Sequence, residues 1–161
     1  MLMCDFLYGA VSKKDYNKKF IEISLKYNIP VDYTFESSLF PLKKSNNNYV
    51  FFRLTNNYCD CNLPIGYGEN NIKSRYLNSP HKRDIFLNSI YSDINHYINY
   101  LHELKNLDCI SHIYWVKHWD NNEPEKSCPK YIIHVDDIDR NVLLNFKSEV
   151  AYKIQFYKKY Y

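Results

Sequence analysis

Glycine is scarce in this chain, and its scarcity excludes the commonest phosphate-binding motifs. The 161 residues include three glycines, Gly9, Gly66 and Gly68. A P-loop and a dinucleotide-binding fingerprint each need several glycines close together, because the backbone must approach a phosphate group closely. The chain also lacks the G-x-S-x-G turn of α/β-hydrolases and the histidine–cysteine pattern of zinc deaminases. We therefore expect no cofactor, and no motif identifies a catalytic residue.

Long apolar runs are missing as well. No segment approaches the roughly 20 apolar residues that a membrane-spanning helix needs. Residues 1–11 are apolar, but they include Asp5 and no basic leader, so they indicate a strand and not a signal peptide. The five cysteines are odd in number and irregularly spaced, which is typical of reduced thiols. We expect a cytoplasmic protein without a membrane partner.

The composition is that of a globular protein. Apolar residues make up 45% of the chain and charged residues 24%, and aromatic residues are abundant, with 17 tyrosines. This balance and length predict one globular domain over residues 1–161. The net charge of +3 is too small to indicate nucleic-acid binding. Lysines gather near both ends and acidic residues between them, which suits either a charged partner face or ordinary solvated faces.

Periodicity predicts an alternation of strands and helices. Residues 49–55 alternate most clearly, with Val50, Phe52 and Leu54 on one face. Ser79 and Pro80 mark a helix start, because a capping hydroxyl precedes proline at the first helical position. The predicted strands are 2–8, 31–35, 49–55, 109–119, 130–136 and 150–157, and the predicted helices are 12–28, 79–106 and 137–146. This order predicts an α/β (α+β) fold, with a ferredoxin-like β-α-β-β-α-β core and a C-terminal β-α-β extension on a mixed sheet.

A pair of thiols follows the third predicted strand. Cys59 and Cys61 are one residue apart, and Cys4 lies in the first strand. Two such thiols can bind zinc, although no fourth ligand is evident, and small unreactive thiols are the alternative. We expect the first and third strands to run parallel as neighbours. That arrangement would place Cys4 and Cys59 at opposite edges of the sheet.

Histidines form a second candidate site. If residues 109–119 and 130–136 form a hairpin, His118 and His134 are diagonal neighbours about 7 to 8 Å apart. Asp120 and Asp136 flank them. Such a set could hold a divalent metal for phosphodiester cleavage, with a tyrosine as nucleophile. Ordinary polar strand histidines are the alternative interpretation.

Aromatic residues form a third candidate site. Phe6 or Tyr8 on the first strand, with Tyr49, Phe51 and Arg53 on the third, have the chemistry of a platform that stacks single-stranded bases. Core packing explains such alternation equally well. Trp115 and Trp119 share one strand face with Lys117 between them and suit either a core or an interface.

Three classes of function remain. The first is a small non-enzymatic interaction protein or inhibitor, of the immunity-factor or phage counter-defence type, that occupies a protein partner's surface. Its abundant tyrosines fit this class because they supply rigid amphipathic contact area. The second is a single-stranded nucleic-acid binder using the aromatic platform. The third is a metal-dependent phosphodiesterase using His118 and His134.

Overall fold

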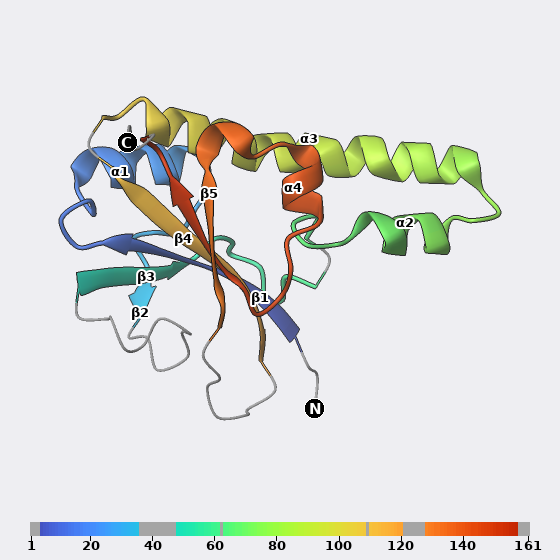
Figure 1. The fold of residues 1–161 in the computed structure, drawn as a ribbon, viewed down its shortest axis with the longest axis horizontal. Helices are drawn as coiled ribbons and strands as arrows, with labels where there is room; N and C mark the ends of the chain where they lie inside the picture. The colour runs from blue at the N-terminus through green and yellow to red at the C-terminus, as the bar shows by residue number, and fades with distance from the viewer. Residues whose placement is uncertain (1–3, 36–47, 62, 109, 121–127, 158–161) are drawn as a thin grey trace.

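The fold is a mixed α+β arrangement built on one sheet (Figure 1). The computed structural model describes residues 4–35, 48–61, 63–108, 110–120 and 128–157. Six strands lie in the order β2-β3-β1-β4-β6-β5. Every neighbouring pair is antiparallel except β5 and β6, which are parallel. The strands are β1 (Cys4–Ser12), β2 (Thr34–Phe35), β3 (Tyr49–Arg53), β4 (His112–Asp120), β5 (Lys130–His134) and β6 (Ala151–Gln155).

Two of the helices begin at a capping side chain. α1 (Lys18–Lys26) is capped by Asn17, whose side chain accepts from the Phe20 N–H, and α4 (Arg140–Leu144) is capped in the same way by Asp139. α3 (Pro80–Lys105) starts at its proline, as predicted, but the Ser79 side chain, which was expected to cap it, makes no capping hydrogen bond. Two short elements were not predicted: α2 (Glu69–Arg75), which lies between the predicted strand 49–55 and the predicted helix 79–106, and the 3-10 turn η2 (Val135–Asp137).

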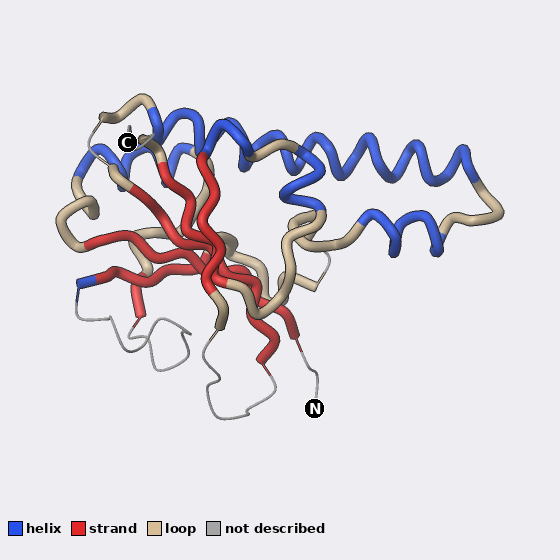
Figure 2. The backbone as a smooth tube through the Cα atoms, viewed as in Figure 1, coloured by secondary structure: helices blue, strands red, loops and turns tan. Residues whose placement is uncertain are grey.

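The helices lie along one side of the sheet, and α3 extends well beyond it (Figure 2). α3 packs against α1 and α4, and its far end runs beside α2 as an arm (Figure 1). None of the described helices is long and apolar enough to cross a membrane.

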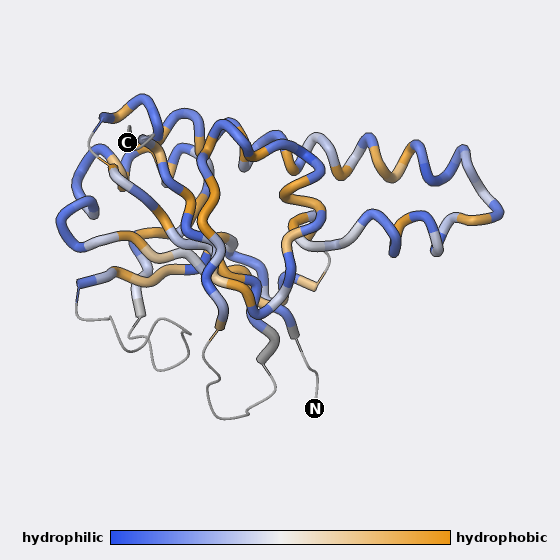
Figure 3. The backbone as a smooth tube through the Cα atoms, in the orientation of Figure 1, coloured by the Kyte–Doolittle hydropathy of each residue, from blue (hydrophilic) through white to orange (hydrophobic). Residues whose placement is uncertain are grey.

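Two apolar clusters occupy the two faces of the sheet. The larger cluster lies between the sheet and the helices, where segments rich in apolar residues face one another (Figure 3). It includes Leu7, Phe52, Ile113, Trp115 and Ile154 from the strands and Phe20, Ile94, Tyr100 and Leu101 from the helices. The smaller cluster, on the opposite face, includes Tyr8, Ala10, Phe51, Tyr114 and Val116.

Two predicted strand relations are wrong. β1 and β3 are neighbours, as expected, but they run antiparallel, with Tyr8 opposite Arg53 and Ser12 opposite Tyr49. β4 and β5 do not form a hairpin, because β6 lies between them and pairs with both. The direction of β3 and the neighbour of β4 both depend on how the chain returns to the sheet, and local alternation does not encode that path.

Candidate functional site

The antiparallel pairing brings the start of β1 and the segment after β3 together at one edge of the sheet, meaning an edge formed by the ends of the strands and not an edge strand. The Asp60 N–H donates to the Asp5 carbonyl at 2.9 Å, and the Asp5 N–H donates to Cys61 Sγ at 3.4 Å. The prediction that Cys4 and Cys59 lie at opposite edges is therefore wrong, although the Cys4 side chain is outside the described part. Among the described residues, no group of three or more His, Cys, Asp or Glu side chains could hold a metal ion.

Asp60 anchors this edge as a buried carboxylate. Its side chain is fully buried and accepts from the Leu7 N–H at 2.8 Å, from Arg53 Nη2 at 2.7 Å and from the Thr55 hydroxyl. The Arg53 guanidinium also lies 4.6 Å from the centre of the Phe6 ring. Arg53 was expected on an open platform, but its guanidinium pairs with the buried carboxylate of Asp60.

Lys117 is a buried ammonium at the same edge, and sequence reasoning did not single it out as a site residue. It is 5% exposed, and its Nζ lies 3.7 Å from Asp5 Oδ2. Burial raises the pKa of Asp5, while the charge of Lys117 opposes that rise. The alternation of side chains along β4 could have indicated the burial of Lys117, because this residue lies on the same inward face as Ile113 and Trp115.

A cavity of about 480 Å³ opens beside this ion pair. Asp5 and Lys117 form part of its lining, together with Cys61, Gly66, Tyr67 and Arg75. Arg75 Nη1 donates to the Tyr67 hydroxyl at 2.7 Å. The lining therefore combines two cations, one carboxylate and several hydrogen-bonding groups.

The expected aromatic platform lies on one face of the sheet, opposite the helices. Tyr8 and Phe51 belong to the smaller apolar cluster, and Phe6 and Tyr49 pack against it. Tyr8 is 7% exposed and Phe51 is 4% exposed. Stacking of bases needs accessible ring faces. These two rings therefore offer no open stacking surface.

A polar chain crosses the same face through His112, which was not among the predicted site residues. The Ser111 hydroxyl lies 3.3 Å from Asp15 Oδ2 and 2.8 Å from His112 Nδ1, and the Tyr49 hydroxyl lies 2.9 Å from His112 Nε2. If Ser111 donates to Asp15, its oxygen accepts from Nδ1–H, and Nε2 accepts from Tyr49. This assignment requires a neutral imidazole.

We expect the protein to lose stability as the pH falls from about 6.5 to about 4, with His112 as one cause. Burial, supported by the charge of Lys153, lowers the pKa of His112 from 6.5 to about 4. Between these values the unfolded state binds a proton that the folded state excludes, so His112 costs no stability above pH 6.5 and an increasing amount as the pH falls toward 4. In His112→Gln, the free energy of unfolding should fall between pH 6.5 and pH 4 by on the order of 1 kcal/mol less than in the wild type, as measured by urea unfolding at both pH values. His81→Gln, at an exposed position of α3, is the control, and equal slopes in all three proteins would contradict the assignment.

The two histidines expected to form a metal site are far apart in the sheet. His118 lies opposite Phe6, and its Nδ1 is 2.9 Å from Glu149 Oε2. His134 lies opposite Gln155 on β6, which in turn pairs with His112. The expected diagonal contact is therefore wrong, because β6 lies between β4 and β5.

Of the acidic residues expected beside these histidines, Asp136 lies next to His134, with its Oδ2 3.5 Å from His134 Nδ1. Asp136 forms an ion pair with Lys105 at 2.7 Å, and that hydrogen bond lowers the pKa of Asp136. The side chains of Asp120 and Trp119 lie outside the described part of the structure. Trp115 is fully buried in the larger cluster, which agrees with the core alternative.

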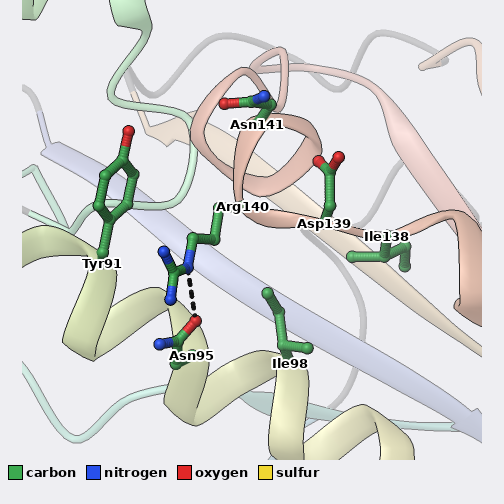
Figure 4. A pocket seen from close by; sticks show the side chains of 7 residues that line it. All are labelled: Tyr91, Asn95, Ile98, Ile138, Asp139, Arg140 and Asn141. Carbon is green, nitrogen blue, oxygen red and sulfur yellow. Dashed lines mark hydrogen bonds between the residues drawn. The ribbon is translucent and has the colours of Figure 1, made fainter.

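A second hollow, of about 530 Å³, separates α3 from α4 (Figure 4). Arg140 lies across it, with Nε donating to Asn95 Oδ1 at 2.9 Å and its guanidinium 5.1 Å from the centre of the Tyr91 ring. Asp139 caps α4 here. These contacts join the two helices, so the hollow has a structural explanation.

The edge strand β5 carries apolar side chains on its surface. Tyr131 is 56% exposed and Ile132 is 60% exposed. Among the described strands, β5 has β6 as its neighbour on one edge and none on the other. The Pro129 carbonyl accepts from the Ala151 N–H at 2.9 Å. In a parallel ladder, the N–H and C=O groups of every second residue point toward the neighbouring strand. Since Pro129 bonds to β6, the backbone groups of Lys130, Ile132 and His134 point away from β6.

Comparison of the chain with protein-family models, with curated proteins and with solved structures finds no match.

Proposed function

We propose that this protein is a small non-enzymatic interaction protein or inhibitor that binds an extended segment of a partner protein along β5. The observation that carries the proposal is the apolar edge strand, with Tyr131 and Ile132 exposed and alternate backbone groups directed outward. Unpaired edge groups are a template for an added strand, and natural proteins usually protect such edges. An added strand would gain main-chain hydrogen bonds and apolar contact together.

The charges beside β5 favour a particular partner sequence. Ile132 lies opposite Lys153 on β6, and Lys130 lies two residues before Ile132 on the same face. The other face of β5 carries Tyr131, which packs edge-on against Tyr152. Side chains of an added strand alternate between these faces. The best partner segment therefore alternates acidic residues, over the lysines, with apolar residues, over Tyr131.

We also propose that β1 to β4, with α1 and α3, form a ferredoxin-like core in a single cytoplasmic domain that has no membrane partner. The order β4-β1-β3-β2, antiparallel throughout, supports this proposal. In such a core β5, α4 and β6 form the extension. The proposed binding edge is then the extension's outermost strand.

The proposal predicts hydrogen-exchange protection at β5 when a short synthetic peptide alternating glutamate and valine is added. The amides of Lys130, Ile132 and His134 should be protected, because they point to the open edge. The amides of Tyr131 and Ile133 already face β6, so they should not change. Residue-resolved amide exchange by NMR measures both sets, and a lysine–valine peptide should bind at least about tenfold more weakly.

A proline substitution separates strand addition from general stickiness. Ile132→Pro removes an outward N–H without breaking the bonds to β6, and proline is tolerated on edge strands. We expect it to abolish peptide binding, whereas Leu77→Ser, which removes an exposed apolar side chain from the arm between α2 and α3, should not. Binding that survives Ile132→Pro, or protection outside β5, would refute the proposal. Protection that appears with protein concentration and no peptide would identify a second copy as the occupant instead.

A further inference from the structure

The ammonium of Lys117 is buried but weakly partnered. Its side chain is 6% exposed, and its Nζ lies 3.3 Å from the Ile65 carbonyl, 3.4 Å from the Gly66 carbonyl and 3.7 Å from Asp5 Oδ2. Strong charge-assisted hydrogen bonds are shorter, at about 2.7 to 2.9 Å. A buried cation normally needs better compensation than these contacts provide.

The carboxylate beside it is also incompletely satisfied. Asp5 Oδ1 is buried and has no hydrogen-bond partner among the described residues. Burial raises the pKa of Asp5, which weakens its hold on the ammonium. The ion pair therefore leaves donor capacity on Lys117 and acceptor capacity on Asp5 for a ligand to use.

The cavity wall is shaped closely around Lys117. At Gly66, φ is +73°, and a Cβ there would lie 2.7 Å from the Phe146 carbonyl oxygen and 3.0 Å from Lys117 Cδ. The Gly66 N–H donates to the Leu143 carbonyl at 2.8 Å, which fixes this loop against α4. Only glycine fits this position, and the loop fits directly against the lysine stem.

A second cation lines the cavity from α2. Arg75 is exposed and donates to the Tyr67 hydroxyl, which also lines the cavity. Lysine and arginine together suit an oxyanion, since the planar guanidinium can donate two parallel hydrogen bonds to two oxygens of a phosphate or carboxylate. The volume of about 480 Å³ lies within the range of small-molecule sites and exceeds the needs of a free ion.

We propose that this cavity binds the phosphate or carboxylate group of a small metabolite, with Lys117 as the buried anion contact and Arg75 as the exposed one. This site is separate from the proposed binding edge at β5, so either proposal can fail without the other. Asp5 competes with the ligand for Lys117.

The scarcity of glycine provides a direct test by NMR. Gly66 and Gly68 lie in the segment beside the cavity, whereas Gly9 lies inside β1, so the three glycine amides give two reporters and one internal control. Titration with glycerol phosphate or with glycerate should shift the amide resonances of Gly66 and Gly68 and leave Gly9 unchanged, whereas uncharged glycerol should shift none of the three. We expect an anion to bind with a dissociation constant below about 1 mM, and glycerol not to bind. The tighter of the two anions identifies the group.

Three substitutions decide the roles. Lys117→Met keeps the length of the side chain and should weaken anion binding at least about thirtyfold. Arg75→Gln, at an exposed position, should weaken it by about tenfold without affecting folding. Asp5→Asn should tighten binding, because it removes the competing negative charge. The inference is overturned if neither anion shifts Gly66 or Gly68, if both variants Lys117→Met and Arg75→Gln bind like the wild type, or if Asp5→Asn weakens binding.

Discussion

Replacing Asp60 with alanine should lower the free energy of unfolding by about 3 to 5 kcal/mol, which is a large part of the stability of a domain this size. The carboxylate is fully buried and serves three donors: the Leu7 N–H, Arg53 and Thr55. Its removal leaves a buried backbone N–H without an acceptor and a partly buried guanidinium without a counter-charge. Each of these losses carries a desolvation cost that no remaining group offsets.

Urea unfolding followed by circular dichroism measures this effect. Asp60→Asn keeps the shape and one acceptor but loses the charge, so we expect a cost of about 2 kcal/mol. Asp93→Ala, at an exposed position on α3, should change stability by less than about 0.5 kcal/mol. If Asp60→Ala proves as mild as Asp93→Ala, Asp60 is not the anchor of this edge.

Local patterns predicted the elements well, because each depends on neighbouring residues. Alternation at Tyr49–Arg53 gave β3, and Ser79 followed by Pro80 gave the start of α3. The helix predicted to begin at residue 12 begins instead at Lys18, with Asn17 as its capping residue, because Ser12 still pairs with Tyr49 at the end of β1. A capping side chain can be read from sequence only if the preceding strand has ended.

The order of the strands in the sheet could not be predicted from local patterns. The prediction that His118 and His134 meet depended on a hairpin, and the insertion of β6 between β4 and β5 removed it. β6 comes last in the chain and is held by pairing with both strands, so its position depends on contacts between distant residues. Alternation identifies which residues share a face but not which strand lies beside which.

Alternation along the strands sorted the aromatic residues of the candidate platform onto one face of the sheet, but it could not show how deeply they are buried. Phe6, Tyr8, Tyr49 and Phe51 share one face, as the pattern indicated, but the burial of Tyr8 and Phe51 depends on the whole fold. Lys117 shows the opposite case. Its place among inward-facing apolar residues was visible in the pattern of β4, whereas Asp5 and Arg75 join it only through antiparallel pairing and the path of α2.

Among the described residues, Trp115 is the largest fully buried side chain, and it belongs to the larger apolar cluster. Trp115 is fully buried and packs against the rings of Tyr97, Tyr100 and Phe146. Trp115→Ala should therefore cost about 3 to 5 kcal/mol, from lost apolar burial and from the cavity left among three rings that cannot collapse together. Urea unfolding should show a lower midpoint with an unchanged slope.

Trp115→Phe tests the polar part of this residue separately. The indole Nε1 is buried and has no hydrogen-bond partner among the described residues. Phenylalanine leaves a smaller cavity and removes the unsatisfied N–H, so the two effects oppose each other and we expect a cost of about 1 kcal/mol. A cost equal to that of Trp115→Ala would mean that the N–H contributes a hydrogen bond, for example to an internal water. In that case the centre of the core is a polar anchor, and its stability depends on that bond as well as on apolar packing.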